Sequence, residues 1–253
     1  MFKQSFCWWA FKDHGVADDA LLQAAARIGY AGVEFLPDEL WPRAKDLGLA
    51  IATMAGQGPI HDGLNRRENH SSILEAFRPK LATAVAHGVP TLIVFSGNRQ
   101  PGVSDSDAAD ITAEGLAKLA PLAEQAGVDI VLELLNSKVN HIGYQADSTA
   151  WGAEVCRRTG SPRVKLLYDI YHMQLMEGDL IRTIEQCHGV IGHYHTAGCP
   201  GRAEINDDQE IHYPGVFRAI ARTGYTGYIG HELVPAGDPI AALKQAFDLT
   251  AAV

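Results

Sequence analysis

Short apolar runs alternate with amphipathic segments along almost the whole chain. The apolar runs predict eight strands, at residues 3–9, 32–36, 49–54, 90–95, 129–134, 164–167, 190–195 and 228–232. Between them, apolar residues recur at helical spacing, which predicts a helix after each strand. These helices are expected near residues 18–28, 38–47, 71–87, 107–126, 148–158, 179–187, 214–222 and 239–249.

Eight strand-then-helix units with short connections predict an α/β fold, a (β/α)8 barrel (TIM barrel) formed by a single domain over residues 1–253. The run at residues 92–95 is continuously apolar, and that at 128–132 is apolar except for Asp129, as expected of parallel strands that are buried on both faces. An open, doubly wound sheet is the structural alternative. It is disfavoured because no Gly-x-Gly-x-x-Gly turn follows the first strand.

Composition narrows the classes of function. The formal net charge is -9, which argues against a nucleic-acid partner because phosphate binding relies on clusters of Lys and Arg. No apolar run approaches the length of a membrane span, and the N-terminus lacks the layout of a signal peptide. The cysteines have no metal-binding spacing, so we expect reduced thiols in a cytoplasmic protein. They are Cys7, Cys156, Cys187 and Cys199.

Acidic residues and one histidine stand where the predicted strands end. Because the active site of such barrels lies at the C-terminal ends of the strands, we take these residues as candidates: Glu34, Glu133, Asp169, His195 and Glu232. Any one of them alone could be a helix cap or a surface charge. The last four follow four consecutive strands and are expected to face one mouth. Carboxylates so close together repel each other unless a cation neutralises them.

Three carboxylates and one imidazole suit a divalent cation from the harder end of the series, namely Mn²⁺, Mg²⁺ or Co²⁺. Zinc is an alternative, although no cysteine stands at these strand ends. A barrel rim held by salt bridges, without any metal, is the other alternative.

Four segments carry a resemblance to a known family. They are Leu-Glu-Leu-Leu-Asn at 132–136, Tyr-Asp-Ile-Tyr-His-Met-Gln-Leu-Met-Glu-Gly at 168–178, Gly-His-Tyr-His at 192–195 and Gly-His-Glu at 230–232. Together they resemble the xylose isomerase-like barrels, above all the hydroxypyruvate isomerase group and the related ketose 3-epimerases. The resemblance covers nearly the whole chain and is sharpest between residues 130 and 233. The 168–178 segment is its most specific part.

The resemblance implies roles for particular residues. The metal ligands would be Glu133, Asp169, His195 and Glu232, holding Mn²⁺ or Mg²⁺, or else Co²⁺. Glu133 and Glu232 would also be the catalytic acid and base on opposite faces of the substrate. His172 would contact the substrate, and Arg202 would lie over its oxygens. The alternatives are a core histidine that is satisfied by the backbone and an arginine on a mobile loop.

The implied reaction is proton transfer next to a carbonyl, on a small-molecule hydroxy-carbonyl or sugar substrate. Isomerisation of hydroxypyruvate to tartronate semialdehyde is favoured, and 3-epimerisation of a free ketose such as tagatose or psicose is the alternative. Two departures leave the substrate open, because His195 replaces the glutamine that is frequent in the isomerases, and Trp8 and Trp9 are bulkier than usual. The resemblance also implies a homo-oligomer, a dimer or a tetramer.

Two other classes of function remain as distant alternatives. A metal-dependent nuclease like endonuclease IV would need more histidine ligands and a basic groove, and the net charge of -9 counts against it. A non-catalytic sugar-binding protein on the same fold would not need the pair Glu133 and Glu232.

Overall fold

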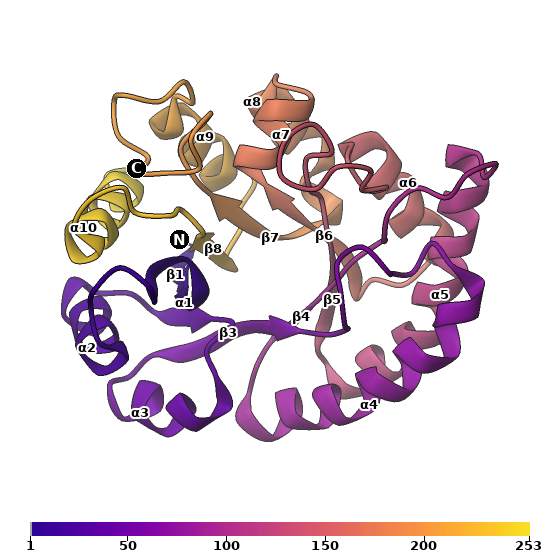
Figure 1. Ribbon diagram of the computed structural model, residues 1–253, viewed down its shortest axis with the longest axis horizontal. Helices are drawn as coiled ribbons and strands as arrows, with labels where there is room; N and C mark the ends of the chain where they lie inside the picture. Colours follow the sequence, from indigo (N-terminus) through magenta and orange to yellow (C-terminus); the bar gives the residue numbers. More distant parts are fainter. Residues whose placement is uncertain (1) are drawn as a thin grey trace.

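Eight parallel strands close into a barrel in a computed structural model that describes residues 2–253. Each strand pairs with its neighbour in the sequence, and the last strand pairs with the first (Figure 1). The strands are β1 Lys3–Cys7, β2 Gly32–Glu34, β3 Ala50–Ala55, β4 Thr91–Val94, β5 Asp129–Glu133, β6 Val164–Asp169, β7 Ile191–Thr196 and β8 Tyr228–His231. The predicted (β/α)8 barrel is confirmed, and its parallel strands all end at one mouth.

Helices surround the barrel and cover its outer face (Figure 1). The α-helices are α1 Trp8–Phe11, α2 Asp18–Ile28, α3 Trp41–Asp46, α4 His70–His87, α5 Asp105–Ala126, α6 Thr149–Thr159, α7 Ile170–Met176, α8 Leu180–Cys187, α9 Tyr213–Arg222 and α10 Pro239–Ala251. Short 3₁₀ helices are η1 Asp38–Leu40, η2 Arg67–Asn69 and η3 His188–Val190. Within residues 2–253, no helix combines the length and apolar character needed to cross a membrane.

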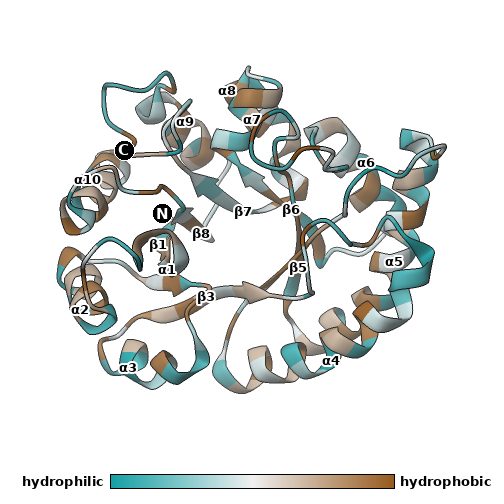
Figure 2. Cartoon of the chain, in the orientation of Figure 1, coloured by the Kyte–Doolittle hydropathy of each residue, from teal (hydrophilic) through white to brown (hydrophobic). Residues whose placement is uncertain are grey.

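Apolar residues fill the space between the strands and the helices, and polar residues gather on the loops and the outer helix faces (Figure 2). The packing between the two layers is close. A Cβ atom built on Gly152 of α6 would lie 2.8 Å from Leu134 and 2.9 Å from Leu166 of β6. Glycine therefore allows this close approach, and a larger residue would require the two leucine side chains to shift.

Several predicted strand ends are off by one or two residues, and two differences at the mouth affect the site. The first strand ends at Cys7, and not at Trp9, because the chain turns directly into α1. The short helix α7 was not expected, and it begins at once after β6. Its N-cap is Asp169, whose side chain accepts a hydrogen bond from the backbone N–H of His172, so the strand and the helix join without a loop.

Tyr144 ties together the chain segments that follow β4 and β5. Its fully buried hydroxyl accepts a hydrogen bond from the backbone N–H of Ser96 and donates one to the carbonyl of Glu133, both at 3.0 Å. The backbone of a candidate site residue is therefore held by a buried side chain from the neighbouring loop.

We expect Tyr144→Phe to lower the free energy of unfolding by about 1–3 kcal/mol, because it leaves a buried backbone N–H without an acceptor. Urea unfolding followed by circular dichroism measures this change. Tyr228→Phe is the matched control, since the described residues offer the Tyr228 hydroxyl no hydrogen-bond partner, only the cation of Lys3 over its ring. Equal unfolding free energies for the two variants would contradict the proposed role of Tyr144.

Candidate active site

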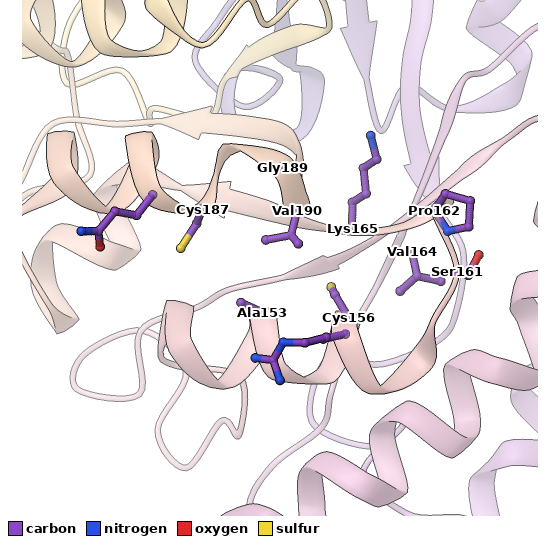
Figure 3. A pocket seen from close by; sticks show the side chains of 11 residues that line it. Ala153, Cys156, Ser161, Pro162, Val164, Lys165, Cys187, Gly189 and Val190 are labelled. Carbon is purple, nitrogen blue, oxygen red and sulfur yellow. The ribbon is translucent and has the colours of Figure 1, made fainter.

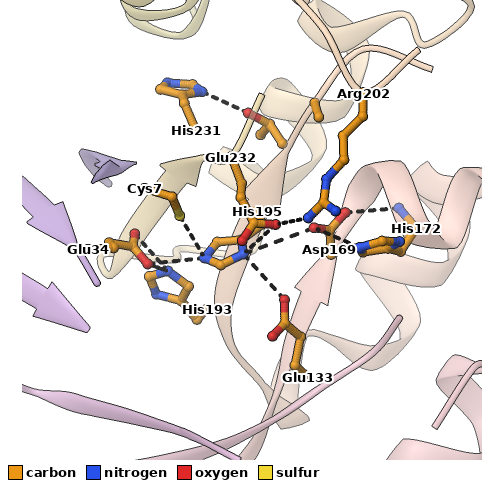
Figure 4. A network of polar contacts seen from close by, with 12 residues as sticks. Cys7, Glu34, Glu133, Asp169, His172, His193, His195, Arg202, His231 and Glu232 are labelled. Atoms are coloured by element: carbon orange, nitrogen blue, oxygen red, sulfur yellow. Dashed lines mark hydrogen bonds and ion pairs between the residues drawn. The ribbon is translucent and has the colours of Figure 1, made fainter. Parts of the chain in front are cut away.

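Four of the predicted site residues converge at the mouth of the barrel (Figure 4). The ring nitrogen Nδ1 of His195 lies 3.5 Å from Glu133 Oε1, 4.0 Å from Asp169 Oδ2 and 3.6 Å from Glu232 Oε2. Glu133 and Asp169 are the last residues of β5 and β6, and Glu232 follows β8 directly. All four side chains are buried. The structure thus brings the four residues together as the sequence predicts.

The donor atoms of this group suit a divalent cation. One ligand atom from each of the four residues lies within 4.8 Å of all the others. Asp169 Oδ2 and His195 Nδ1 are buried and have no hydrogen-bond partner among the described residues, which is costly unless another group satisfies them. Atoms that bind one ion at about 2.1 Å lie roughly 3–4 Å from each other. Three carboxylates and one imidazole therefore fit an ion such as Mn²⁺ or Mg²⁺.

Asp169 performs two tasks with its two oxygens. Oδ1 accepts the backbone N–H of His172 at 2.9 Å and caps α7, whereas Oδ2 is free and faces His195. Burial and the charge of Glu232 raise the pKa of Asp169 to about 7, against the opposing effect of Arg202. The helix-cap and metal-ligand interpretations of this residue are therefore compatible.

A chain of hydrogen bonds fixes the proton on the ring of His172. The amide oxygen of Asn136 accepts the backbone N–H groups of Val139 and Asn140, both at 2.9 Å. Its amide nitrogen is thereby turned toward His172 Nδ1, at 2.5 Å. Burial and the charge of Arg202 hold the pKa of His172 well below its usual range. His172 is therefore neutral with its proton on Nε2.

The N–H group of His172 at Nε2 is available to a ligand. It is buried, lacks a hydrogen-bond partner among residues 2–253, and lies 3.8 Å from Asp169 Oδ2. The Nδ1 atom of the ring is hydrogen-bonded to the side chain of Asn136. The core-histidine interpretation expects hydrogen bonds to the backbone instead. The free donor points to the region in front of the four acidic and imidazole groups (Figure 4).

Arg202 is anchored in the loop after β7. Its backbone has the left-handed conformation, with φ of 55°, which is uncommon for a residue other than glycine. Its carbonyl accepts the backbone N–H of Val234 at 2.8 Å. The guanidinium lies 5.3 Å from the ring centre of Trp9 and 5.7 Å from that of Tyr171. It donates to Glu232 Oε2 at 2.5 Å, so this arginine is not on a loosely held loop.

The two glutamates of the centre have different surroundings. Burial raises the pKa of Glu133, although His195 works against this effect. Burial also penalises the charge of Glu232, but Arg202 and His195 hold its pKa well below the usual range. The indole N–H of Trp9 donates to its second oxygen at 3.2 Å. Two carboxyl groups in contrasting environments are typical of acid–base sites.

The sequence did not reveal every residue of the site. Trp9 contacts Glu232, whereas Trp8 donates to Asp18 at the start of α2. His61 is exposed. Glu34 lies beneath His195, in contact with its other ring nitrogen. Sequence position indicated Glu34 as a candidate, since it ends a strand, but the turn that directs Trp9 inward has no comparable signal.

A separate hollow lies on the outside of the barrel, between α6 and the segment that joins α8 to β7 (Figure 3). It is lined at one end by Val164 and Lys165, which begin β6, whereas Asp169 ends that strand at the mouth. Burial raises the pKa of the Cys156 thiol there to about 12, so this sulfur is a poor nucleophile. The hollow is not connected with the chemistry at the mouth.

Comparison with known proteins identifies relatives over nearly the full chain. A sequence model of the xylose isomerase-like TIM barrel family matches residues 22–252. The human putative hydroxypyruvate isomerase is 29% identical over 245 residues, covering 89% of this chain and 87% of that protein. Hydroxypyruvate isomerase of Escherichia coli is 29% identical over 243 residues, covering 89% and 91%. A structure of L-ribulose 3-epimerase superposes with a TM-score of 0.81 at 21% identity, covering 100% and 94%.

We expect Asp169→Asn to separate metal binding from folding. The amide oxygen can still cap α7, but an amide nitrogen replaces the free oxygen that faces His195. Saturating Mn²⁺ at about 100 times its dissociation constant should stabilise the wild-type protein by about 2.7 kcal/mol. Thermal unfolding with Mn²⁺ and with EDTA should show this difference in the wild type and lose most of it in the variant. An equal Mn²⁺ response in both proteins would exclude Asp169 as a ligand.

Proposed function

The chain belongs to the xylose isomerase-like TIM barrel family and is an isomerase, and we propose that it is metal-dependent and interconverts hydroxypyruvate and tartronate semialdehyde. The observation that carries this proposal is the pair of buried carboxyl groups, Glu133 and Glu232, on either side of the unpartnered Nδ1 of His195. Two such groups can move a proton between adjacent carbons of a substrate held between them.

The proposed metal ligands are Glu133, Asp169, His195 and Glu232. When bound, a divalent cation supplies Lewis-acid polarisation of the carbonyl oxygen and the adjacent hydroxyl oxygen of the substrate. One glutamate takes the proton from the hydroxymethyl carbon, and the other delivers a proton to the former carbonyl carbon, while the hydroxyl proton passes to the former carbonyl oxygen. The burial of both side chains excludes water from the transferred proton.

Two side chains can orient the substrate. The Nε2–H group of His172 is an unpartnered buried donor for a substrate oxygen. Arg202 keeps a buried Nε–H group without a partner among the described residues, and its fixed fork of donors matches a carboxylate. Hydroxypyruvate has a carboxylate next to its carbonyl, whereas a free ketose has none. The arginine therefore favours the keto acid.

A ketose 3-epimerase is the second candidate, and His195 favours it. The ketose 3-epimerases carry histidine at this position of the seventh strand, where glutamine is frequent in the hydroxypyruvate isomerase group. The same pair of glutamates would serve this reaction if the proton returned to the same carbon from the other face. The substrate decides between the two candidates.

We expect solvent deuterium to enter hydroxypyruvate and tartronate semialdehyde, but not fructose or tagatose, in an NMR time course in D₂O with Mn²⁺. Removing the metal with EDTA should stop the exchange, and Glu133→Gln should slow it by about 10²–10⁴-fold, because one acid–base group is lost. Glu114→Gln, on the surface of α5 and paired with Arg67, is the control. Exchange into a ketose alone would replace the isomerase proposal with the epimerase.

We expect Arg202→Lys to distinguish a carboxylate substrate from a sugar. Lysine keeps the positive charge but loses the fork, and hydrogen bonds to a charged group contribute about 1.5–3 kcal/mol. The kcat/KM for hydroxypyruvate should fall about ten-fold more than that for any ketose with measurable turnover. Steady-state kinetics with both substrates measure the difference. An equal loss for both would mean that Arg202 acts only through Glu232.

A further inference from the structure

A second polar cluster lies in the barrel interior, beneath the four residues at the mouth (Figure 4). Its centre is Glu34, the last residue of β2, which is fully buried. The carboxylate accepts hydrogen bonds from Ser5 of β1, from Thr53 of β3 at 2.8 Å, from His193 at 3.1 Å and from His195 at 3.0 Å. One carboxylate thus connects strands from opposite sides of the barrel.

The hydrogen bonds around Glu34 match the number of acceptor sites on its carboxylate. An ionised carboxylate offers about four lone-pair sites, and four donors are present. Ser5 approaches Oε1, Thr53 and His195 approach Oε2, and His193 Nε2 lies 3.1 Å from both oxygens. Both histidines can donate only if each carries its proton on Nε2. In the neutral imidazole of His195, Nδ1 then carries the lone pair, and that atom faces the three acidic groups at the mouth.

We infer that Glu34 is a positioning residue for His195: it holds the proton on Nε2 and directs the lone pair of Nδ1 to the metal. The inference rests on the proposed metal centre. A carboxylate that accepts the far N–H of a ligand histidine fixes the ring orientation and makes the imidazole a stronger ligand. Glu34 would therefore act on the metal without touching it.

Gly230 of β8 has no side chain, and this leaves room for the contact between Glu34 and His195. A Cβ atom built on Gly230 would lie 2.2 Å from Glu34 Oε1 and 3.0 Å from His195 Cδ2. The first distance is too short for real atoms and the second is tight, so any other residue at 230 would displace the carboxylate and crowd the imidazole. The glycine and the glutamate, which are far apart in the sequence, therefore belong to one arrangement.

A different arrangement of the same residues would make Glu34 a direct ligand. Glu34, His193 and His195 each have one possible metal-ligand atom, and these three atoms also lie within 4.8 Å of each other. The hydroxyl groups of Ser5 and Thr53 already occupy acceptor sites of the carboxylate, which favours hydrogen bonding over a second ion. The number of metal ions bound separates the two arrangements.

Isothermal titration of the metal-free protein with Mn²⁺ tests the inference. We expect one ion per chain in both wild type and Glu34→Gln, with affinity 10–100-fold weaker in the variant. Asp147→Asn is the matched control, because Asp147 is another buried carboxylate, paired with Arg99 and Ser137, and its loss should leave the affinity unchanged. Unchanged affinity in a folded Glu34→Gln protein, or two ions in wild type and one in the variant, would overturn the inference.

A double-mutant cycle shows whether Glu34 acts through His195. In a His195→Gln background, replacing Glu34 by Gln should change Mn²⁺ affinity by less than about two-fold, because the interaction between the two residues is already absent. A further ten-fold loss in that background would show that Glu34 acts on the centre by its charge alone, which contradicts a positioning role.

Nitrogen NMR of the metal-free wild-type protein tests the same point without a mutation at Glu34. We expect Nε2 of the His195 ring to carry a proton, which it donates to Glu34. An Nε2 without a proton would overturn the inference even if the variant failed to fold. Failure of the wild type to bind Mn²⁺ would instead reject the proposed metal centre, so the two failures can be told apart.

Discussion

The constraint on which this mouth depends is the electrostatic cost of holding three carboxyl groups together away from water. Glu133, Asp169 and Glu232 are all buried within reach of one imidazole, and such a group is stable only with compensating positive charge. Arg202 supplies part of it through its pair with Glu232, and the proposed cation would supply the rest. The positive charges that stabilise the buried carboxyl groups, those of Arg202 and of the proposed cation, are therefore also the ones proposed to act on the substrate.

The site is organised in layers along the barrel axis. Glu34, Ser5 and Thr53 form the lowest layer and hold the imidazole of His195 from below. The three acidic groups surround the upper side of that ring. His172 and Arg202 lie above, each with an unpartnered buried donor. Glu34 holds His195 and Asn136 holds His172, so the position of a substrate depends on residues that it never contacts.

Sequence reasoning predicted the barrel and the four converging residues because both follow from regular patterns. The periodicity of apolar residues predicts the order of strands and helices, and parallel strands place their last residues at one mouth. The parts that it missed depend on local geometry. The turn after Cys7 brings Trp9 to Glu232, and Asp169 begins α7 without a loop. The left-handed backbone of Arg202 and the space left by Gly230 require atomic contacts to be recognised.

The hydrogen bond between the Arg202 carbonyl and the Val234 backbone N–H joins the loop after β7 to the chain that follows Glu232. The arginine and the glutamate that it pairs with are thus linked through the backbone as well as through their side chains. Two loops that share such a link depend on each other for their conformation. A loop exchanged between relatives to alter specificity would have to bring its partner loop with it, and single-loop chimaeras would lose the alignment of both side chains.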